Sequence, residues 1–393
     1  MRLAFRKPSV LLSDVTFCGT EGAHRGDIKI RANKIVSMSR NLDGSKGTLR
    51  AEAADAVALP GLVNSHDHLD FSLFPNLGHG PYANYIEWGD DIWQRDKSEI
   101  EAVLRVPMRD RLLWGGYRNL FAGVTTVVHH NPYFAAFDRD YPVRVVKDYD
   151  WAHSLDLEKE RSHIRAGRRP FIIHLAEGTD ALARDELDRL HALGALTSKT
   201  IIVHGIAIQK ESLDNVPKGA GLVWCPSSNQ FLFGQTADIK TLATRFRIAL
   251  GSDSPLTSKG NFLDEIRSAR ATGIATDREL IAMITQTPAS LFGLQGLGNL
   301  EEGGIADVLL LDRQGTDPWE SLWPATQRNI QLVLKAGKPM YGDERFEPLF
   351  EALGRPYDRV NCEGRVKLVG GKFAKLVERI ERVLPEARRK ISP

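Results

Sequence analysis

Short and almost wholly apolar runs recur between residues 61 and 255, and longer mixed segments separate them. The clearest runs are GLVNSHDH (61–68), GVTTVVHHNP (123–132), VRVVKDYDW (143–151), FIIHLAEG (171–178), TIIVHGIA (200–207), GLVWCPSSN (221–229) and RIALGSDSP (247–255). Such runs are typical of parallel strands that are buried on both faces. The segments between them suit helices, since Leu187, Leu190 and Leu193, for example, fall at helical spacings. This alternation predicts an α/β fold, and the strand number favours a (β/α)8 TIM-like barrel.

Both ends of the chain carry β-branched residues broken by Gly, Asp and Asn, which predicts short strands and turns. We therefore expect residues 57–298 to form the barrel, and residues 1–56 and 299–365 to pair into one small β-sandwich domain. Residues 366–393 are expected to be an amphipathic helix, with Phe373 on its apolar face. Glutamates dilute the basic charge of the other face, so this helix should pack on its own chain or on another subunit rather than on a membrane.

The composition excludes several classes of partner. The 393 residues carry a formal net charge of +2, so no basic surplus points to nucleic acid. No apolar stretch approaches the roughly 18 residues that a membrane span needs, and the first residues lack a signal-peptide pattern. The 3 cysteines are too scattered for a disulfide framework. We therefore expect a cytoplasmic protein that binds neither nucleic acid nor membrane.

Polar residues that could bind a metal follow several of the predicted strands. His66 and His68 are two positions apart, so a strand directs both imidazoles to the same side and turns Asp67 away. His174, His204 and Asp253 each follow another apolar run. Strand ends of a barrel open onto one rim, where active sites lie. Imidazoles gathered there predict a site for a divalent metal. Glu177, three residues after His174, could shuttle protons beside it.

The motifs resemble those of the amidohydrolase superfamily, and within it the metal-dependent aminohydrolases that include ring deaminases and triazine hydrolases. The resemblance rests on PGLVNSHDH, HLAEG, IIVHG, WCPSSN and LGSDSP in that order, and it covers most of the chain. It implies one divalent metal, held by His66, His68, His174 and Asp253, with Zn²⁺ favoured and Fe²⁺ as the alternative. It also implies an enzyme that hydrolyses C–N bonds other than peptide bonds, most simply by removing an amino group from a small heteroaromatic ring.

The same resemblance assigns roles around that metal. Asp253 would accept the proton of the attacking water, and Glu177 would protonate the adjacent ring nitrogen. His204 would orient the water and hydrogen-bond the new oxygen. Asn229 would lie behind the site or at its rim. Relatives of this kind often assemble into dimers or larger forms, so the resemblance also allows a homo-oligomer.

The segment after His68 is where the chain departs from the family pattern. It contains no arginine before Arg95, which argues against recognition of an acidic substrate group. Its His79, Tyr82, Trp88 and Trp93 are candidates for substrate contact, because an aromatic lid suits a flat ring. The same aromatic residues could equally anchor a loop on the barrel or form a dimer contact. The run from His68 to His174 is also short, so the strands within it should be trimmed.

Three other residues have open roles in the sequence. Lys147 precedes the third histidine and could support a second metal, as in other branches of the superfamily. His129 and His130 follow a predicted strand, and one of them could face the pocket while the other packs outside. His153 is expected to be an ordinary surface residue.

Two other functions compete with ring deamination. The first keeps the site but opens a cyclic amide or removes another leaving group. The second is a non-catalytic scaffold of the kind that arises when a metal hydrolase loses its ligands, although this chain keeps every ligand position and the glutamate.

Overall fold

The structure is a computed structural model that describes residues 8–19, 22–44, 47–138, 140–157 and 164–389. Residues 1–7 and 390–393, which belong to the first and last segments of the predicted division, lie outside this described part.

Within the described residues, eight parallel strands follow one another in chain order and form two sheets. The first sheet has the order β6-β7-β8 and the second has the order β13-β12-β11-β10-β9. Their bounds are Leu62–Asp67 (β6), Val124–His129 (β7), Arg144–Val145 (β8), Asp150–Ala152 (β9), Phe171–Leu175 (β10), Thr200–His204 (β11), Gly221–Trp224 (β12) and Arg247–Leu250 (β13). The ends of β13 and β6 lie together, because the Asp253 N–H donates to the His66 carbonyl over 3.0 Å. The predicted mixed α/β architecture is therefore confirmed.

One expected strand is divided in the structure. Residues 143–151 form β8 and β9, which belong to different sheets, and no helix separates them. The chain changes partners between them: the Val146 N–H donates to the Val127 carbonyl of β7, whereas the Asp150 N–H donates to the Pro170 carbonyl next to β10. The expected trimming between His68 and His174 therefore falls on β8 and β9, of two and three residues.

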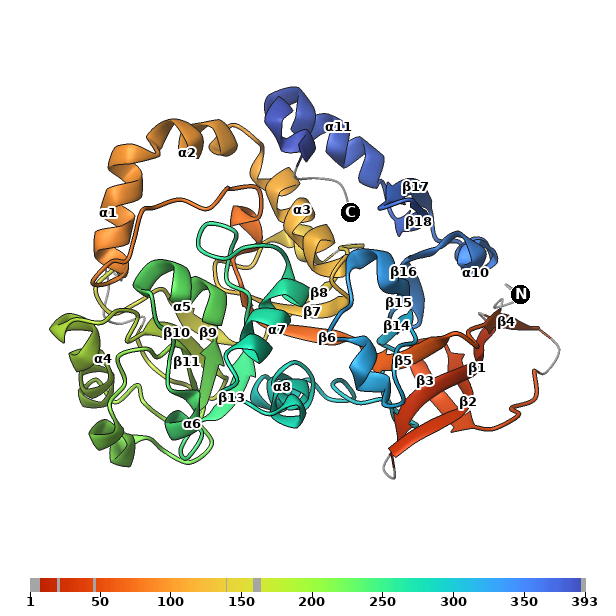
Figure 1. Ribbon diagram of the computed structural model, residues 1–393, viewed down its shortest axis with the longest axis horizontal. Coiled ribbons are helices and arrows are strands. Elements are labelled where there is room, and N and C mark those ends of the chain that lie inside the picture. Colours follow the sequence, from red (N-terminus) through yellow and green to blue (C-terminus); the bar gives the residue numbers. More distant parts are fainter. Residues whose placement is uncertain (1–7, 20–21, 45–46, 139, 158–163, 390–393) are drawn as a thin grey trace, which may run out of the picture.

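Helices connect and cover these strands (Figure 1). They are Tyr85–Arg95 (α1), Lys97–Leu104 (α2), Met108–Leu120 (α3), Ala181–Ala192 (α4), Pro226–Phe233 (α5), Ile239–Leu242 (α6), Phe262–Ala271 (α7), Asp277–Met283 (α8) and Gln286–Leu291 (α9). Helix α4 confirms part of the periodicity expected of it, because it buries Leu187 and Leu190, whereas Leu193 follows the helix and is 42% exposed. The Asp180 side chain begins this helix by accepting the Ala183 N–H over 3.0 Å.

The two ends of the chain meet in a single ten-stranded sheet, in which β5 from the first segment pairs with β14 from the last. In Figure 1 the red strands lie directly beside the blue ones. The strands are Ser9–Gly19 (β1), Gly22–Arg31 (β2), Lys34–Ser39 (β3), Thr48–Glu52 (β4), Ala56–Pro60 (β5), Val308–Asp312 (β14), Ile330–Lys335 (β15), Lys338–Asp343 (β16), Tyr357–Cys362 (β17) and Arg365–Gly370 (β18), with helix α10 at Glu347–Ala352.

The last helix, α11 (Phe373–Val383), packs on its own chain, which was one of the two expected outcomes. The Phe373 ring centroid lies 5.0 Å from that of Tyr117 and 5.3 Å from that of Phe121. Arg379 adds an ion pair with Asp110, at 2.7 Å between Nη2 and Oδ1. The helix begins later than the expected residue 366, because residues 365–370 form strand β18 between β16 and β17.

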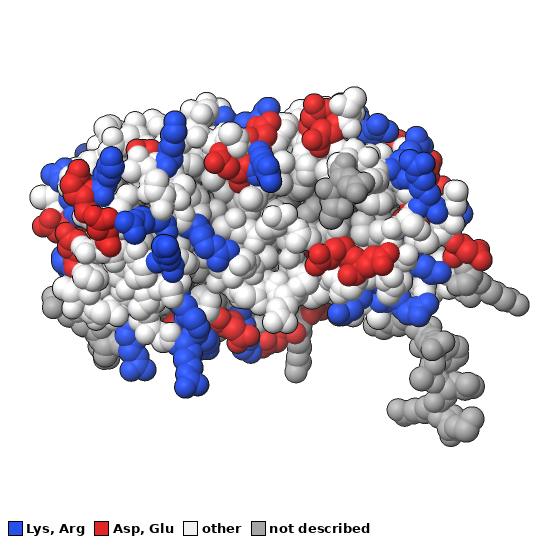
Figure 2. All heavy atoms as spheres, turned by 90° about the horizontal axis from the view of Figure 1, so that it is seen from below, with Lys and Arg blue, Asp and Glu red and all other residues white. Residues whose placement is uncertain are grey.

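The surface and the helices agree with the sequence in two respects. On the face shown in Figure 2, basic and acidic residues are interspersed rather than gathered into an area of one sign. Among the described residues, none of the helices has the length and apolar character that crossing a membrane requires.

The docking of α11 predicts a measurable contribution to stability. Replacing Phe373, which is 2% exposed, with alanine should lower the free energy of unfolding by about 3–5 kcal/mol, because a cavity replaces a ring packed against two others. Denaturant unfolding measures this difference. Lys375→Ala, on the exposed side of the same helix, should change it by less than about 0.5 kcal/mol. Equal effects of the two substitutions would contradict this packing.

Candidate metal centre

Three imidazole nitrogens converge at the ends of β6 and β10. His174 Nε2 lies 3.3 Å from His66 Nε2 and 3.4 Å from His68 Nε2. Zinc–nitrogen bonds of about 2.0–2.1 Å at tetrahedral angles place ligand atoms about 3.3–3.4 Å apart. The spacing of the three nitrogens therefore suits one ion bound between them.

Asp253 adds a carboxylate to this group. Its Oδ1 lies 3.7 Å from His66 Nε2 and 3.8 Å from His68 Nε2. The other oxygen, Oδ2, accepts hydrogen bonds from Ser228 Oγ at 2.8 Å and from Thr257 Oγ1 at 3.0 Å. Burial by itself would raise the pKa of Asp253, but the neighbouring imidazoles lower it well below its usual range. The carboxylate is therefore ionised and held in one orientation.

Three of the strand ends at this site have unusual backbone conformations. Ala176, His204 and Asp253 have φ values of 53°, 73° and 54°, in the left-handed region that residues other than glycine seldom adopt. Such conformations persist where surrounding structure compels them, and they are concentrated at functional sites. Here they turn the chain at the ends of β10, β11 and β13, from which the site side chains project.

The histidines have the protonation states that metal binding requires. Burial, together with neighbouring imidazoles, lowers the pKa of His68 and His174 well below the ordinary value, so both rings are neutral. His174 Nδ1 lies 2.7 Å from the carbonyl oxygen of His153 and donates its proton to it. This leaves the Nε2 lone pair of His174 directed at the site, the arrangement expected of a metal ligand.

Glu177 and His204 face each other across the same site, with Glu177 Oε1 3.4 Å from His204 Nε2. Burial raises the pKa of Glu177 well above its usual range, and the nearby Asp253 and Glu186 raise it further. The Glu177 side chain is therefore a neutral acid that can give up a proton. His204 Nδ1 lies 2.8 Å from Asn229 Oδ1, which orients the ring from behind. Asn229 thus takes the first of the two places expected of it, behind the site.

A buried acid that the sequence did not reveal supports this arrangement. Glu186, on α4, accepts the Ala176 N–H at 2.6 Å and lies 3.4 Å from the Tyr85 hydroxyl. Burial raises the pKa of Glu186 to about 7. The hydrogen bond from the Ala176 N–H to Glu186 holds the turn that leads from His174 to Glu177.

Asp67, between His66 and His68, faces away from the metal group as expected, and it contacts two side chains of helix α3. Its Oδ2 accepts a hydrogen bond from Asn119 Nδ2 at 2.7 Å and lies 3.6 Å from Arg118 Nη1. Burial raises the pKa of Asp67 to about 6, against the influence of Arg118 and Asn119. Arg118 also donates to the Gly260 carbonyl at 2.7 Å.

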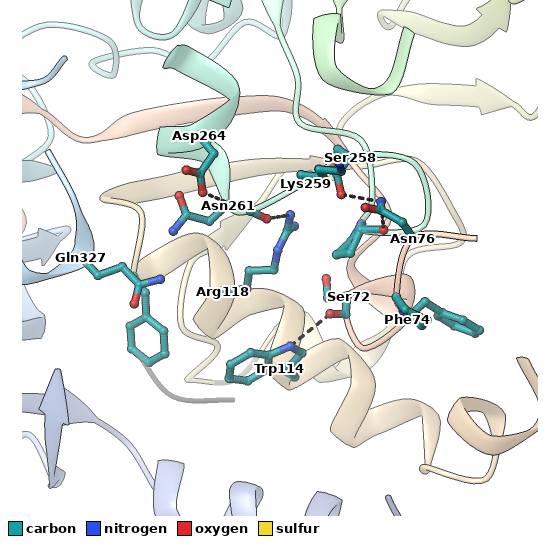
Figure 3. Close-up of a pocket in the computed structure, with 14 residues that line it drawn as sticks. Ser72, Phe74, Asn76, Trp114, Arg118, Ser258, Lys259, Asn261, Asp264 and Gln327 are labelled. Atoms are coloured by element: carbon teal, nitrogen blue, oxygen red, sulfur yellow. Dashed lines mark hydrogen bonds between the residues drawn. The ribbon is translucent and has the colours of Figure 1, made fainter. Parts of the chain in front are cut away.

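Arg118 borders a cavity of about 410 Å³ between α3 and the loops that follow β6 and β13 (Figure 3). At the edge of this cavity the Asn76 side chain donates to the carbonyls of Pro255 and Ser258, at 2.7 and 2.9 Å. The loops that follow His68 and Asp253 are thereby joined directly.

The aromatic segment after His68 anchors a loop, which was one of its two alternative roles. Trp88 Nε1 donates to the Leu77 carbonyl at 2.9 Å, and the Tyr82 hydroxyl donates to Asp91 at 2.6 Å. Trp93 is 55% exposed and His79 has a 60% exposed side chain near Asp91. These contacts describe how the segment is held, and contact of the four side chains with the substrate stays a prediction.

Lys147 does not approach the metal group. Its side chain is 62% exposed, lies 3.6 Å from Asp138 and stands over the Tyr133 ring. The reason is the change of partners between β8 and β9, which places this residue in an exposed connection. A bridging role between two metals is thus not supported.

The structure separates the two adjacent histidines. His129 packs outside, where its Nδ1 accepts the Leu69 N–H at 3.2 Å. His130 is fully buried, and its ring stacks on that of His174 with centroids 4.1 Å apart.

His153 is not the ordinary surface residue that the sequence predicted. It follows β9, its carbonyl orients His174, and its ring centroid lies 4.9 Å from that of His174. A strand as short as β9 leaves no periodicity from which the position of His153 could be predicted.

Comparison with known proteins agrees with this geometry. Residues 157–340 match the amidohydrolase family. A 5-methylthioadenosine/S-adenosylhomocysteine deaminase of Haloquadratum walsbyi is 25% identical over 73% of this chain and 80% of its own. Two solved structures share the fold: a zinc-bound adenosine deaminase from Xanthomonas campestris (TM-score 0.70, 17% identity, 97% of this chain and 99% of that one) and a triazine hydrolase from Arthrobacter aurescens (TM-score 0.69, 17% identity, 88% and 99%).

The match to the amidohydrolase family, over just under half of the chain, agrees with its motifs, and together with relatives named as deaminases it indicates an enzyme of the aminohydrolase type. Several of its relatives in sequence bear the names of deaminases.

His204 lies close enough to His66 and His174 to share an ion with them, as His68 and Asp253 do with His66, so the ligands must be distinguished from His204 by experiment. We expect His68→Ala and His174→Ala to retain less than about a tenth of the wild-type metal content after purification, because each removes one corner of the nitrogen group. His204→Gln should retain it. Elemental analysis of the purified proteins measures the content. If His204→Gln lost the metal while His68→Ala and His174→Ala kept it, His204 would be a ligand and the assignment of His68 and His174 would be wrong.

Proposed function

We propose that this protein is a metal-dependent aminohydrolase that removes an amino group from a small heteroaromatic ring with water. The observation that carries the proposal is a buried glutamate, Glu177, beside a group of three imidazole nitrogens and one carboxylate. Relatives named as deaminases of adenosine-containing compounds add support.

Each side chain has a separate task in the proposed reaction. His66, His68, His174 and Asp253 would hold the metal, which when bound makes water nucleophilic at neutral pH. Asp253, an ionised carboxylate beside the imidazoles, would accept the proton that the attacking water loses. Glu177 donates its proton to the ring nitrogen next to the attacked carbon. His204, held by Asn229, stabilises the oxygen that forms on the substrate. The proton held by Asp253 would then pass to the amino group as the C–N bond breaks, so that ammonia leaves, and the hydroxyl proton of the intermediate would return to Glu177 as the new C=O bond forms.

We further propose one Zn²⁺ ion, because three imidazoles and one carboxylate at tetrahedral spacing suit it, and a zinc-bound relative shares the fold. The same superfamily assignment supports a (β/α)8 barrel for residues 57–298 and a small β-sandwich domain from the two chain ends. A cytoplasmic location and a homo-oligomeric state stay predictions.

The reaction predicts ammonia release from a panel of aminopurines, aminopyrimidines and aminopterins incubated with the zinc-loaded protein. Removal of the metal with a chelator should lower release by more than about 100-fold, and added zinc should restore it, because the ion is what makes water nucleophilic at neutral pH. A coupled ammonia assay measures the rate. Turnover without ammonia would indicate cyclic-amide opening instead, and the absence of turnover with bound zinc would favour the scaffold alternative.

Glu177→Gln should lower kcat by about 10²–10⁴-fold, because the amide cannot supply a proton to the ring nitrogen. The metal content should stay at the wild-type level, since Glu177 is not among the four proposed ligands. Steady-state kinetics and elemental analysis on the same preparation separate the two effects. Glu211→Gln, an exposed glutamate on the connection after β11, is the matched control and should leave kcat unchanged. Unchanged kcat in Glu177→Gln would remove Glu177 from the mechanism.

A further inference from the structure

A fifth histidine, His130, lies directly behind the proposed ligands. It follows strand β7, and its backbone N–H donates to the Asp67 carbonyl at 3.1 Å, between the two histidines of β6. Its ring is fully buried, parallel to the His174 ring within 2° and nearly perpendicular to that of His66, at 84°. The indole of Trp151 closes the remaining side edge-on, with centroids 5.7 Å apart.

The two nitrogens of His130 have different partners. Its Nε2 lies 2.8 Å from the Ala152 carbonyl oxygen, and a carbonyl can only accept, so this nitrogen carries the proton. In the neutral ring, the other nitrogen, Nδ1, is then an acceptor. That acceptor lies 3.3 Å from Nδ1 of His66. The only proton that can occupy this contact belongs to His66.

A proton on His66 Nδ1 leaves the lone pair on His66 Nε2, the nitrogen that faces the group of ligands. The order of donors and acceptors therefore runs from His66 through His130 to the Ala152 carbonyl. His174 achieves the same result in one step, by donating from Nδ1 to the His153 carbonyl. Both carbonyls lie at the end of β9, at residues 152 and 153.

We propose that His130 is a positioning residue for the metal site: by accepting the Nδ1 proton of His66, it selects the tautomer and ring orientation in which His66 can bind the ion. Partners of this kind typically contribute about 10- to 100-fold to metal affinity. The inference rests on the metal site of the proposed function and names a residue outside the four ligands.

Two amide substitutions separate this role from simple filling of space. Asparagine at position 130 can present its side-chain oxygen where Nδ1 of the histidine stood, so it can still accept from His66. Glutamine can place its amide near the former Nε2 and keep a donor for the Ala152 carbonyl, but it offers no acceptor to His66. Both lose the ring stack on His174, so that loss cancels in the comparison.

The experiment is a chelator-competition titration of zinc into the metal-free full-length proteins. We expect His130→Gln to bind zinc about 10- to 100-fold more weakly than the wild type, and His130→Asn to stay within about 3-fold of it. His191→Phe, an exposed histidine on α4, is the control for loss of a histidine elsewhere and should bind as the wild type does. Equal affinities of the two amide variants, or the reverse order, would overturn the proposal.

A second measurement does not depend on the folding of any variant. Nitrogen-15 NMR of the histidine rings in the zinc-loaded wild type reports which nitrogen of each ring carries the proton. Protonated Nε2 on His130 together with protonated Nδ1 on His66 supports the assignment, and protonated Nδ1 on His130 overturns it. A wild type that binds no zinc at all contradicts the metal site and this inference with it. Loss of ammonia release with zinc affinity intact contradicts only the proposed reaction.

Discussion

The close approach of three buried imidazole nitrogens is the constraint on which the rest of this structure depends. His66, His68 and His174 direct Nε2 atoms to within 3.3–3.4 Å along the two contacts to His174, and their rings are almost fully buried. Lone pairs at such distances repel one another unless a cation or a proton lies between them. The surrounding residues are arranged for a cation: the backbone turns sharply at Ala176, His204 and Asp253, and a carbonyl orients His174.

The site residues that the sequence predicted are those that follow the longer parallel strands. His66, His68, His174, His204 and Asp253 follow β6, β10, β11 and β13, of four to six residues, whose apolar runs are plain in the sequence. The period of two correctly separated the histidines of β6 from Asp67. The role of His130 was left open in the sequence, and His153 was expected to be a surface residue. Their contacts arise where β8 and β9 exchange partners, and strands of two and three residues carry no pattern.

The aromatic segment shows a different limit of sequence reasoning. Its composition suggested an aromatic lid but did not reveal that Trp88 and Tyr82 use their polar atoms to bind Leu77 and Asp91 within the segment. The type of a residue determines which interactions it can make, whereas the fold determines which neighbour it makes them with. The fold itself was more accessible: both ends of the chain carry strand patterns, and β5 and β14 join them.

The buried polar group behind β6 has a consequence for the order in which the protein can mature. Asn64 Nδ2 donates to Ser252 Oγ at 2.8 Å, and the Asp253 N–H donates to the His66 carbonyl, so the first and last parallel strands are joined across 188 positions of sequence. Contacts between such distant parts of a chain form late, because a long loop must close first. A ribosome-bound chain that has emerged only as far as β12 lacks both Asp253 and the hydrogen bonds that join β6 to the end of β13. Metal capture is therefore coupled to completion of the parallel strands, and an ion cannot be trapped in a half-made protein by the full set of ligands.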